Sequence, residues 1–415
     1  MHHDYKKDFI WNTLGVFTQN AISPLLLIVI TRVNGIYDSG IFSFAFSIAI
    51  IFWIFGMWGG RTYQVSDLNN EFRRQSYIML RLMLAIIMLV GAVLFSIANN
   101  YDLIKSQLIF VLILFKAIES IADSIYGILQ INSRLYIVGR SLFLKAIVSF
   151  IIFILIDLIT KNIVAASLSI VFINFMFVYY YDLRNCRLFE KITIRKNTFN
   201  LYIHEALLIM KKCSAFFIIS FLSSLSLNIP RYFIDKYYNG QIGYFGILAM
   251  PITLISLFVT LILQPSIVGL SKLYNDKMYT EFNKNVKKIL FIALMIGLFI
   301  LLSGIIAGIP LLEMVFGVSF KGYKFSLVVM LCGGITSALL AILVNILTIM
   351  RRFKAQFYIM LFSTMLLSVL SAVIIKPYGF IGGITLFALI SAAQVVSMFI
   401  FYNIILRSVK NEKNN

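Results

Sequence analysis

The chain has 415 residues, of which 60% are hydrophobic and 13% are charged, and its formal net charge is +19. Soluble domains carry about 25% charged residues and roughly 45–50% apolar residues. A soluble enzyme of this composition could not cover its surface with polar groups, so that class is excluded.

Twelve apolar runs follow one another along the chain, and each is long enough to span a bilayer, which takes about 18 residues or more. They predict an all-α integral membrane protein with about twelve transmembrane helices. The predicted spans are 9–30, 36–59, 77–98, 103–129, 138–156, 163–181, 206–229, 242–268, 289–309, 325–349, 357–375 and 379–406. The pair Gly59-Gly60 predicts a break or hinge at the end of the second span.

The longest polar interval divides the spans six and six. This predicts an N-terminal lobe over 1–182, a cytoplasmic connector over 183–205 and a C-terminal lobe over 206–415. The connections expected outside the membrane are short, and the longest are 230–241 and 310–324.

The basic residues are distributed unevenly between the alternate connections. If both termini are cytoplasmic, the inner segments hold 27 of the 36 Lys and Arg residues, counting Arg81, Arg140 and Lys145 with them, and the outer segments hold 8. Positive residues are enriched on the cytoplasmic side of membrane proteins. The charge is therefore attributed to topology, and no nucleic-acid partner is expected.

The fourth span, 103–129, carries Lys116, Glu119 and Asp123 within about 60° of one another around a helix. A charge near the bilayer centre costs roughly 2.5–3.5 kcal/mol on insertion scales. This stripe should therefore face a water-filled cavity, with Lys116 and Glu119 paired at i,i+3. One lysine against two carboxylates leaves a surplus negative group, which predicts a proton or sodium site at Glu119 and Asp123. An ion pair that only locks the bundle is the alternative.

Polar residues of two spans are candidates for lining such a cavity. Tyr126 and Gln130 continue the stripe of the fourth span, and Asn12 and Gln19 form a milder one in the first. Hydrogen bonds between helices are an equal alternative for the first span.

No cofactor or metal is predicted. Cys186, Cys213 and Cys332 have no metal-binding spacing, and the sequence contains no GxGxxG, Walker A or GxSxG motif. Any pumping must then use an ion gradient or the downhill flux of a substrate.

Four segments resemble bacterial polysaccharide flippases of the multidrug/oligosaccharidyl-lipid/polysaccharide exporter superfamily. They are ITRVNGIYDSGIFSFAFSIA (30–49), GMWGGRTYQVSD (56–67), LNIPRYFIDKYYNGQIGYFGIL (227–248) and LLEMVFGVSFKGY (311–323). The resemblance implies a V-shaped fold of two lobes in the cytoplasmic membrane. It also implies translocation of undecaprenyl-diphosphate-linked repeat units by alternating access, for O-antigen, capsule or another surface polysaccharide. Membrane lipids, a polysaccharide polymerase and the chain-length machinery are the further partners it implies.

A diphosphate cargo needs cations near its path, and arginine donates to phosphate through two parallel hydrogen bonds. The candidate substrate-binding residues are Arg32, Arg61, Lys116 and Arg231. Glu119 and Asp123 depart from the basic cavity that the resemblance implies, or else mark ion coupling.

A multidrug/cation antiporter of the same superfamily is the main alternative, because it shares the twelve spans and acidic groups within the membrane. A peptidoglycan-precursor flippase usually has fourteen spans. A membrane glycan polymerase or ligase is disfavoured by the short outer connections.

Overall fold

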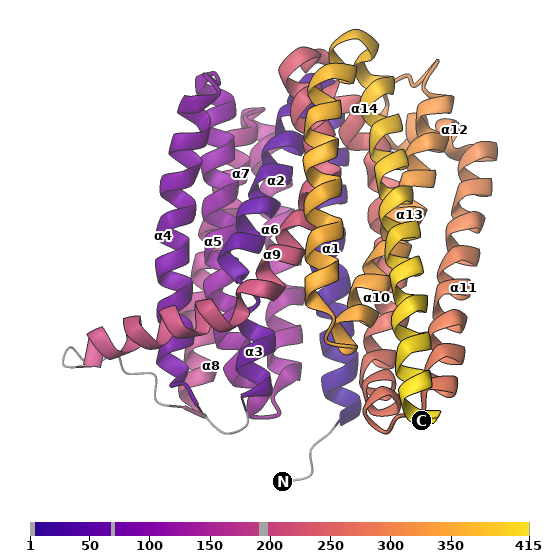
Figure 1. Ribbon diagram of the computed structural model, residues 1–415. Coiled ribbons are helices and arrows are strands. Elements are labelled where there is room, and N and C mark those ends of the chain that lie inside the picture. The colour runs from indigo at the N-terminus through magenta and orange to yellow at the C-terminus, as the bar shows by residue number, and fades with distance from the viewer. Residues whose placement is uncertain (1–4, 68–70, 191–197, 415) are drawn as a thin grey trace. The chain divides into compact units, whose positions relative to one another are not determined.

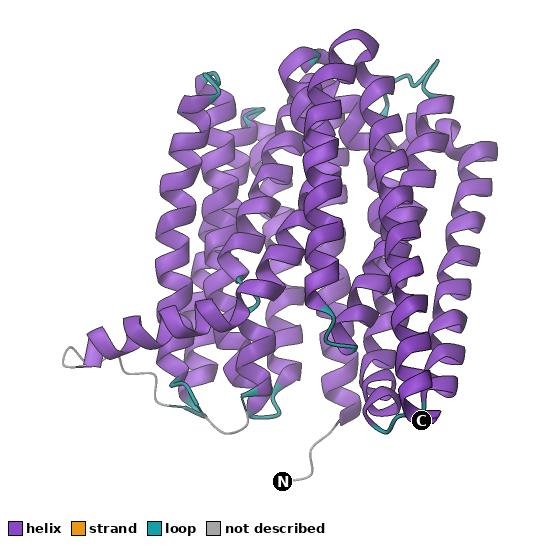
Figure 2. Ribbon diagram, in the orientation of Figure 1, coloured by secondary structure: helices purple, strands orange, loops and turns teal. Residues whose placement is uncertain are grey.

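The computed structural model describes residues 5–67, 71–190 and 198–414. Every regular element in these ranges is helical (Figure 2). Part of the predicted connector, 191–197, lies outside the described residues.

The chain divides into two compact units, Met1–Phe221 and Leu222–Asn415. The division falls within one helix, later in the chain than the predicted connector. The physical reason is a stripe on the first half of that helix, which packs into the core of the first unit through Tyr202, Ala206, Ile209 and Cys213. The lobe boundaries drawn from the sequence stay predictions.

The first unit contains seven spanning or near-spanning helices and several short ones (Figure 1). Their bounds are α1 (Tyr5–Val33), α2 (Ile36–Met57), α3 (Gly60–Ser66), α4 (Arg74–Ala98), α5 (Leu103–Ile131), α6 (Leu135–Thr160), α7 (Ile163–Phe177), the π-helical segment η1 (Val178–Asp182), α8 (Leu183–Arg187) and α9 (Phe199–Tyr237). α5 is the central helix, because it contacts α2, α3, α4, α6, α7, α8 and η1. The outer helices of this unit pack as neighbouring pairs, above all α1 with α6.

The second unit contains the end of α9 and the remaining helices. Their bounds are η3 (Asn239–Gln241), α10 (Ile242–Asn275), α11 (Tyr279–Ser303), η4 (Gly304–Gly308), α12 (Ile309–Phe316), α13 (Lys324–Ile349) and α14 (Phe353–Asn414). α13 packs against α10, α11 and α14. α14 consists of two helical arms that meet at Gly379, whose φ of 57° and ψ of −139° are not helical.

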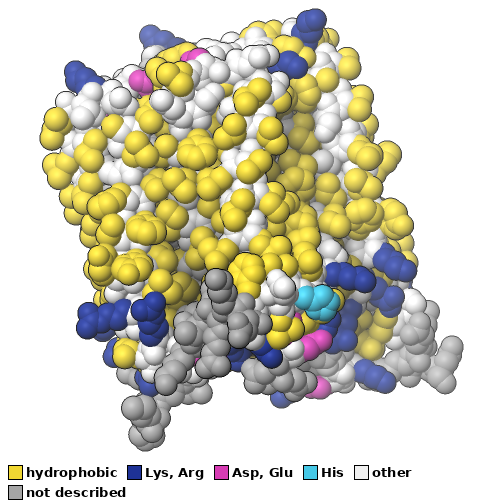
Figure 3. Space-filling model, turned by 90° about the vertical axis from the view of Figure 1, so that its left-hand side faces the viewer, with side chains coloured by type: hydrophobic (Ala, Val, Ile, Leu, Met, Phe, Trp, Pro, Cys, Tyr) yellow, Lys and Arg dark blue, Asp and Glu magenta, His cyan; other side chains and the backbone are white. Residues whose placement is uncertain are grey.

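Ten helices among the described residues are long and apolar enough to cross a membrane, so this is a multi-pass membrane protein, as predicted. α5 is not one of the ten, although it has 29 residues, because Lys105, Lys116, Glu119 and Asp123 interrupt its apolar sequence. On the face in Figure 3, hydrophobic side chains cover the middle, and Lys and Arg gather toward the two ends. This distribution is the one a bilayer requires, because only the ends meet water and headgroups.

Candidate functional site

The predicted charged stripe of α5 lies inside the first unit, and its first two members form an ion pair. Lys116 Nζ lies 2.6 Å from Glu119 Oε2, one helical turn away, and both side chains are 12% exposed. Gln19 of α1 donates a hydrogen bond to the other oxygen of Glu119. The predicted pairing at i,i+3 is confirmed, and Gln19 joins it to α1.

Asp123 is shared by two arginines. Its Oδ1 lies 3.1 Å from Arg61 Nη1, and its Oδ2 lies 3.2 Å from Arg81 Nη2. The expected surplus of negative charge is therefore wrong as a description of this site. Two guanidinium groups and one carboxylate leave a net charge of +1 on this trio.

Arg81 is almost fully buried, with 2% of its side chain exposed. Its Nη1 donates to the carbonyl of Gly56 at 2.8 Å and also to that of Met57, in the last turn of α2. The last carbonyls of a helix have no partner within the helix, and a cation there is stabilised by the helix dipole. Arg81 therefore holds the end of α2 and Asp123 together.

The break that follows α2 places Arg61. Trp58 and Gly59 both adopt left-handed backbone conformations, with φ of 37° and 66°, so the chain turns sharply before α3 begins at Gly60. A large aromatic residue is unusual in that region, because its Cβ crowds the backbone. Trp58 is held there by α9, since its Nε1 donates to Met210 O at 2.9 Å and its ring stacks on Phe217 at 3.7 Å. The break predicted at Gly59-Gly60 is confirmed.

α3 is fixed to α5 by a second polar side chain. Gln64 Nε2 donates to the backbone carbonyl of Ser124 at 3.0 Å, and Gln64 is 1% exposed. Gly127 makes room for it, because a Cβ at that position would lie 2.3 Å from Gln64 Oε1. α3 is therefore seated against α5, and Arg61 projects from it toward the charged stripe.

Arg61 is the accessible member of the trio, with 28% of its side chain exposed. Gln130 Oε1 accepts hydrogen bonds from its Nε at 3.2 Å and its Nη2 at 3.0 Å. The guanidinium carbon lies 5.9 Å from the centre of the Tyr126 ring, within the range of a cation–π contact. Arg61 is thus oriented by its neighbours while part of its surface stays open to a ligand.

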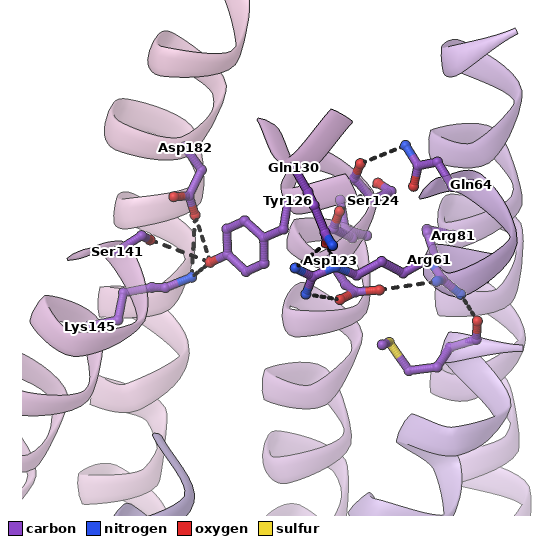
Figure 4. A network of polar contacts seen from close by, with 12 residues as sticks. Arg61, Gln64, Arg81, Asp123, Ser124, Tyr126, Gln130, Ser141, Lys145 and Asp182 are labelled. Carbon is purple, nitrogen blue, oxygen red and sulfur yellow. Dashed lines mark hydrogen bonds and ion pairs between the residues drawn. The ribbon is translucent and has the colours of Figure 1, made fainter. Parts of the chain in front are cut away.

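Behind Tyr126 lies a second, buried polar cluster, which Figure 4 shows on the side of the ring away from Asp123. The Tyr126 hydroxyl donates to Asp182 Oδ2 at 3.1 Å and is 3.4 Å from Ser141 Oγ. Lys145 Nζ donates to the same hydroxyl and lies 3.3 Å from Asp182 Oδ2. The Lys145 and Asp182 side chains are 3% and 0% exposed, so their charges neutralise each other inside the unit.

Arg81, Lys145 and Asp182 were not predicted as site residues, because sequence reasoning assigned the two cations to the inner connections and Asp182 to the edge of the connector. A signal was available, since Arg81 stands in YIMLRLMLAII and Lys145 in SLFLKAIVSFI. A lone cation inside an apolar run is costly unless it faces a partner.

The remaining predicted residues are Asn12, Arg32 and Arg231, and each belongs to another part of the fold. Asn12 lies at the contact of α1 with α6, where a Cβ on Gly139 would approach its backbone nitrogen to 2.5 Å. Arg32 is in the last turn of α1, about 20 Å along the helix from Gln19 at 1.5 Å per residue. Arg231 belongs to the second unit, with its guanidinium 5.1 Å from the centre of the Phe245 ring.

The chain shares its fold with solved structures of a flippase and of transporters. The chain matches the lipid II flippase MurJ in an inward closed conformation, with a TM-score of 0.69, 14% identity, and 95% of this chain and 87% of that chain covered. It also matches an inward-facing multidrug resistance MATE family transporter of the MOP superfamily, with a TM-score of 0.65, 13% identity, and 94% and 96% covered. The fold is therefore that of this exporter superfamily, and these structural neighbours are not enzymes.

A sequence relative of the chain is named for a role in capsular polysaccharide biosynthesis. The capsular polysaccharide biosynthesis protein CapF of Staphylococcus aureus is 26% identical over 394 residues, which cover 93% of this chain and 97% of that protein. No family model matches the chain. The chain is thus a homologue of a capsule biosynthesis protein with the fold of the MOP superfamily, and the resemblance predicted from its loops is confirmed.

Arg61 and Arg81 both pair with Asp123, but Arg81 is buried and Arg61 is partly exposed. We therefore expect the loss of each arginine to change the stability of the protein by a different amount. Arg81→Gln removes a buried cation and leaves two α2 carbonyls and part of Asp123 without their partner, which should cost about 3–5 kcal/mol. Arg61→Gln removes a partly exposed cation and should cost at most about 1 kcal/mol. The apparent unfolding midpoints of the purified variants in one detergent measure this. Equal shifts in both variants would contradict the division of roles.

Proposed function

We propose that the protein is a flippase that moves undecaprenyl-diphosphate-linked oligosaccharide repeat units across the cytoplasmic membrane by alternating access. The observation that carries the proposal is the similarity to a capsular polysaccharide biosynthesis protein over nearly the whole of both chains, on a fold shared with a lipid flippase. The product supplied would be the repeat unit of capsule, O-antigen or another surface polysaccharide.

The net positive trio supports an anionic cargo. Arg61 is held by Asp123 and Gln130 and keeps part of its guanidinium accessible, so it can donate to a diphosphate. Arg32, Lys116 and Arg231 remain proposed contacts for the cargo. Lys116 is the least suited of these in this conformation, because Glu119 already neutralises it.

A multidrug/cation antiporter is the second candidate, favoured by the MATE family transporter among the structural neighbours. A cationic cargo needs an available carboxylate, whereas Asp123 is bound by two guanidinium groups. The polar network therefore favours the anionic cargo.

We further propose twelve membrane crossings with both termini in the cytoplasm. Adding α5, and counting the two arms of α14 separately, raises the ten candidate helices to twelve. An even number of crossings returns the chain to its starting side, and the basic residues identify that side as cytoplasmic.

Cysteine labelling tests this topology. In a protein whose native cysteines are replaced by serine, Gly240→Cys in η3 should react with a membrane-impermeant maleimide on intact cells. Asp276→Cys, after α10, should react only once the membrane is permeabilised. Both positions are exposed, so access to the reagent decides the result. The opposite pattern would contradict the orientation, and labelling of both on intact cells would contradict the crossing between them.

Deletion of the gene in its host should abolish the surface polysaccharide and trap lipid-linked repeat units on the cytoplasmic leaflet, with unchanged sensitivity to cationic drugs. Complementation by Arg61→Gln should restore the polysaccharide roughly 10- to 100-fold less well than the wild type, since hydrogen bonds to charged groups contribute about 1.5–3 kcal/mol. Arg61→Lys should be intermediate.

Arg187→Gln, which removes an exposed cation of α8, is the matched control and should complement fully at equal protein level. Normal polysaccharide in the deletion strain, together with increased drug sensitivity, would reject the flippase and favour the antiporter.

Ion coupling at Glu119 and Asp123 stays a proposal, and the contacts favour Glu119, which has a single cationic partner. Glu119→Gln should reduce the response of transport to a proton or sodium gradient in proteoliposomes. Lys116→Ala should reduce transport as well, because it frees the Glu119 carboxylate, and Asp123→Asn because it releases Arg61. Full gradient-driven activity in all three variants would show that the stripe is only structural.

A further inference from the structure

Arg140 lies on a stripe of α6 whose other side chains are exposed. Leu144, Ile151, Leu155 and Leu158 are 40%, 50%, 53% and 55% exposed, and they follow Arg140 at intervals that keep all five residues within about 60° around the helix. Exposed aliphatic side chains on a spanning helix are suited to contact with lipid chains. Arg140 stands at the end of this exposed aliphatic stripe, in the second turn of α6.

The guanidinium of Arg140 lies within cation–π distance of two aromatic rings. Its central carbon is 4.8 Å from the centre of the Trp11 ring of α1 and 5.6 Å from that of Tyr136. Its Nε is buried and has no hydrogen-bond acceptor among the described residues. Among the described residues, no carboxylate forms an ion pair with Arg140. Arg140 thus contacts two aromatic rings, and its Nε lacks an acceptor among the described residues.

A second cation, Lys7, lies at the same Tyr136 ring as Arg140. Lys7 Nζ lies 4.4 Å from the centre of the Tyr136 ring, and Asp8 accepts a hydrogen bond from the Tyr136 amide at 2.7 Å. Two cations against one carboxylate leave a charge of +1. Tyr181, at the end of η1, is close enough to interact electrostatically with Arg140 and adds a hydroxyl.

We propose that Lys7, Trp11, Tyr136 and Arg140 form a binding site for the phosphate of an anionic phospholipid of the cytoplasmic leaflet. Arg140 donates to the phosphate, Lys7 adds charge, and the acyl chains follow the aliphatic stripe of α6. Basic sites between helices on the cytoplasmic side are suited to such headgroups, because anionic lipids are concentrated there. The choice of leaflet rests on the proposed topology.

A lipid bound here would clamp a close helix contact. A Cβ on Gly139 would lie 2.2 Å from the Trp11 carbonyl oxygen, so the backbones of α1 and α6 touch directly beside the site. A headgroup that bridges Lys7 on α1 and Arg140 on α6 would hold the two helices in this contact. The site is formed by α1 and α6, whereas Arg61 belongs to α3, and the proposed ligand stays in the membrane rather than crossing it.

Lipid retention by the purified protein tests the site. Delipidated protein is mixed with dioleoyl-phosphatidylglycerol or dioleoyl-phosphatidylcholine, and the bound lipid is counted by native mass spectrometry. The wild type should retain phosphatidylglycerol preferentially. Arg140→Gln should retain about five-fold less, as expected for the loss of one basic contact at the membrane surface. Arg187→Gln, with the same charge change on α8, should behave as the wild type.

Arg140→Lys keeps the charge but loses the planar fork, and it should fall between the wild type and Arg140→Gln. It also serves as the test variant if Arg140→Gln is not monodisperse. Equal retention of phosphatidylglycerol by the wild type and both Arg140 variants would overturn the site. Preferential displacement of phosphatidylglycerol by undecaprenyl diphosphate would overturn the phospholipid assignment and give the site to the cargo.

Discussion

The carboxylate of Asp123 lies between the guanidinium groups of Arg61 and Arg81, and much of the first unit is arranged around this contact. Charges inside an apolar bundle are stable only when they are paired and hydrogen-bonded. Arg81, on α4, pairs with Asp123 and also donates to a carbonyl in the last turn of α2. Arg61 pairs with it from α3, and it can do so only because Trp58 and Gly59 turn the chain sharply after α2. One carboxylate on α5 thereby positions three other helices.

The same contact sets the net charge of the polar network on α5. The pair of Glu119 and Lys116 has no net charge. Asp123 with its two arginine partners has a net charge of +1. That charge is most accessible at Arg61, beside Gln130 and above the ring of Tyr126. The buried pair of Lys145 and Asp182 fixes the Tyr126 hydroxyl from behind. An accessible cation on a rigid, neutralised background is suited to binding an anionic group and releasing it again.

Trp58 connects this arrangement to α9, the helix that enters the second unit. Its left-handed backbone is unfavourable for an aromatic residue by roughly 1–2 kcal/mol. Its hydrogen bond to Met210 and its stacking on Phe217 offset that cost. The orientation of α3 and of Arg61 therefore depends on how the first half of α9 packs against Trp58.

The sequence alone determined the class of the protein, because bilayer length, apolar runs and basic connections are local properties that do not depend on how helices pack. The helical break at Gly59-Gly60, the Lys116–Glu119 pair and the resemblance of four loops to polysaccharide flippases were also accessible from it. The sign of the net charge at the site was not accessible from the sequence. Lys116, Glu119 and Asp123 share one helix, so their spacing revealed a stripe with surplus negative charge. Arg61 and Arg81 come from other helices, and only the packing of α3 and α4 on α5 brings them to Asp123 and makes the site positive. Helix periodicity specifies which side chains share a face, whereas the partner of a buried charge is decided by the neighbouring helix.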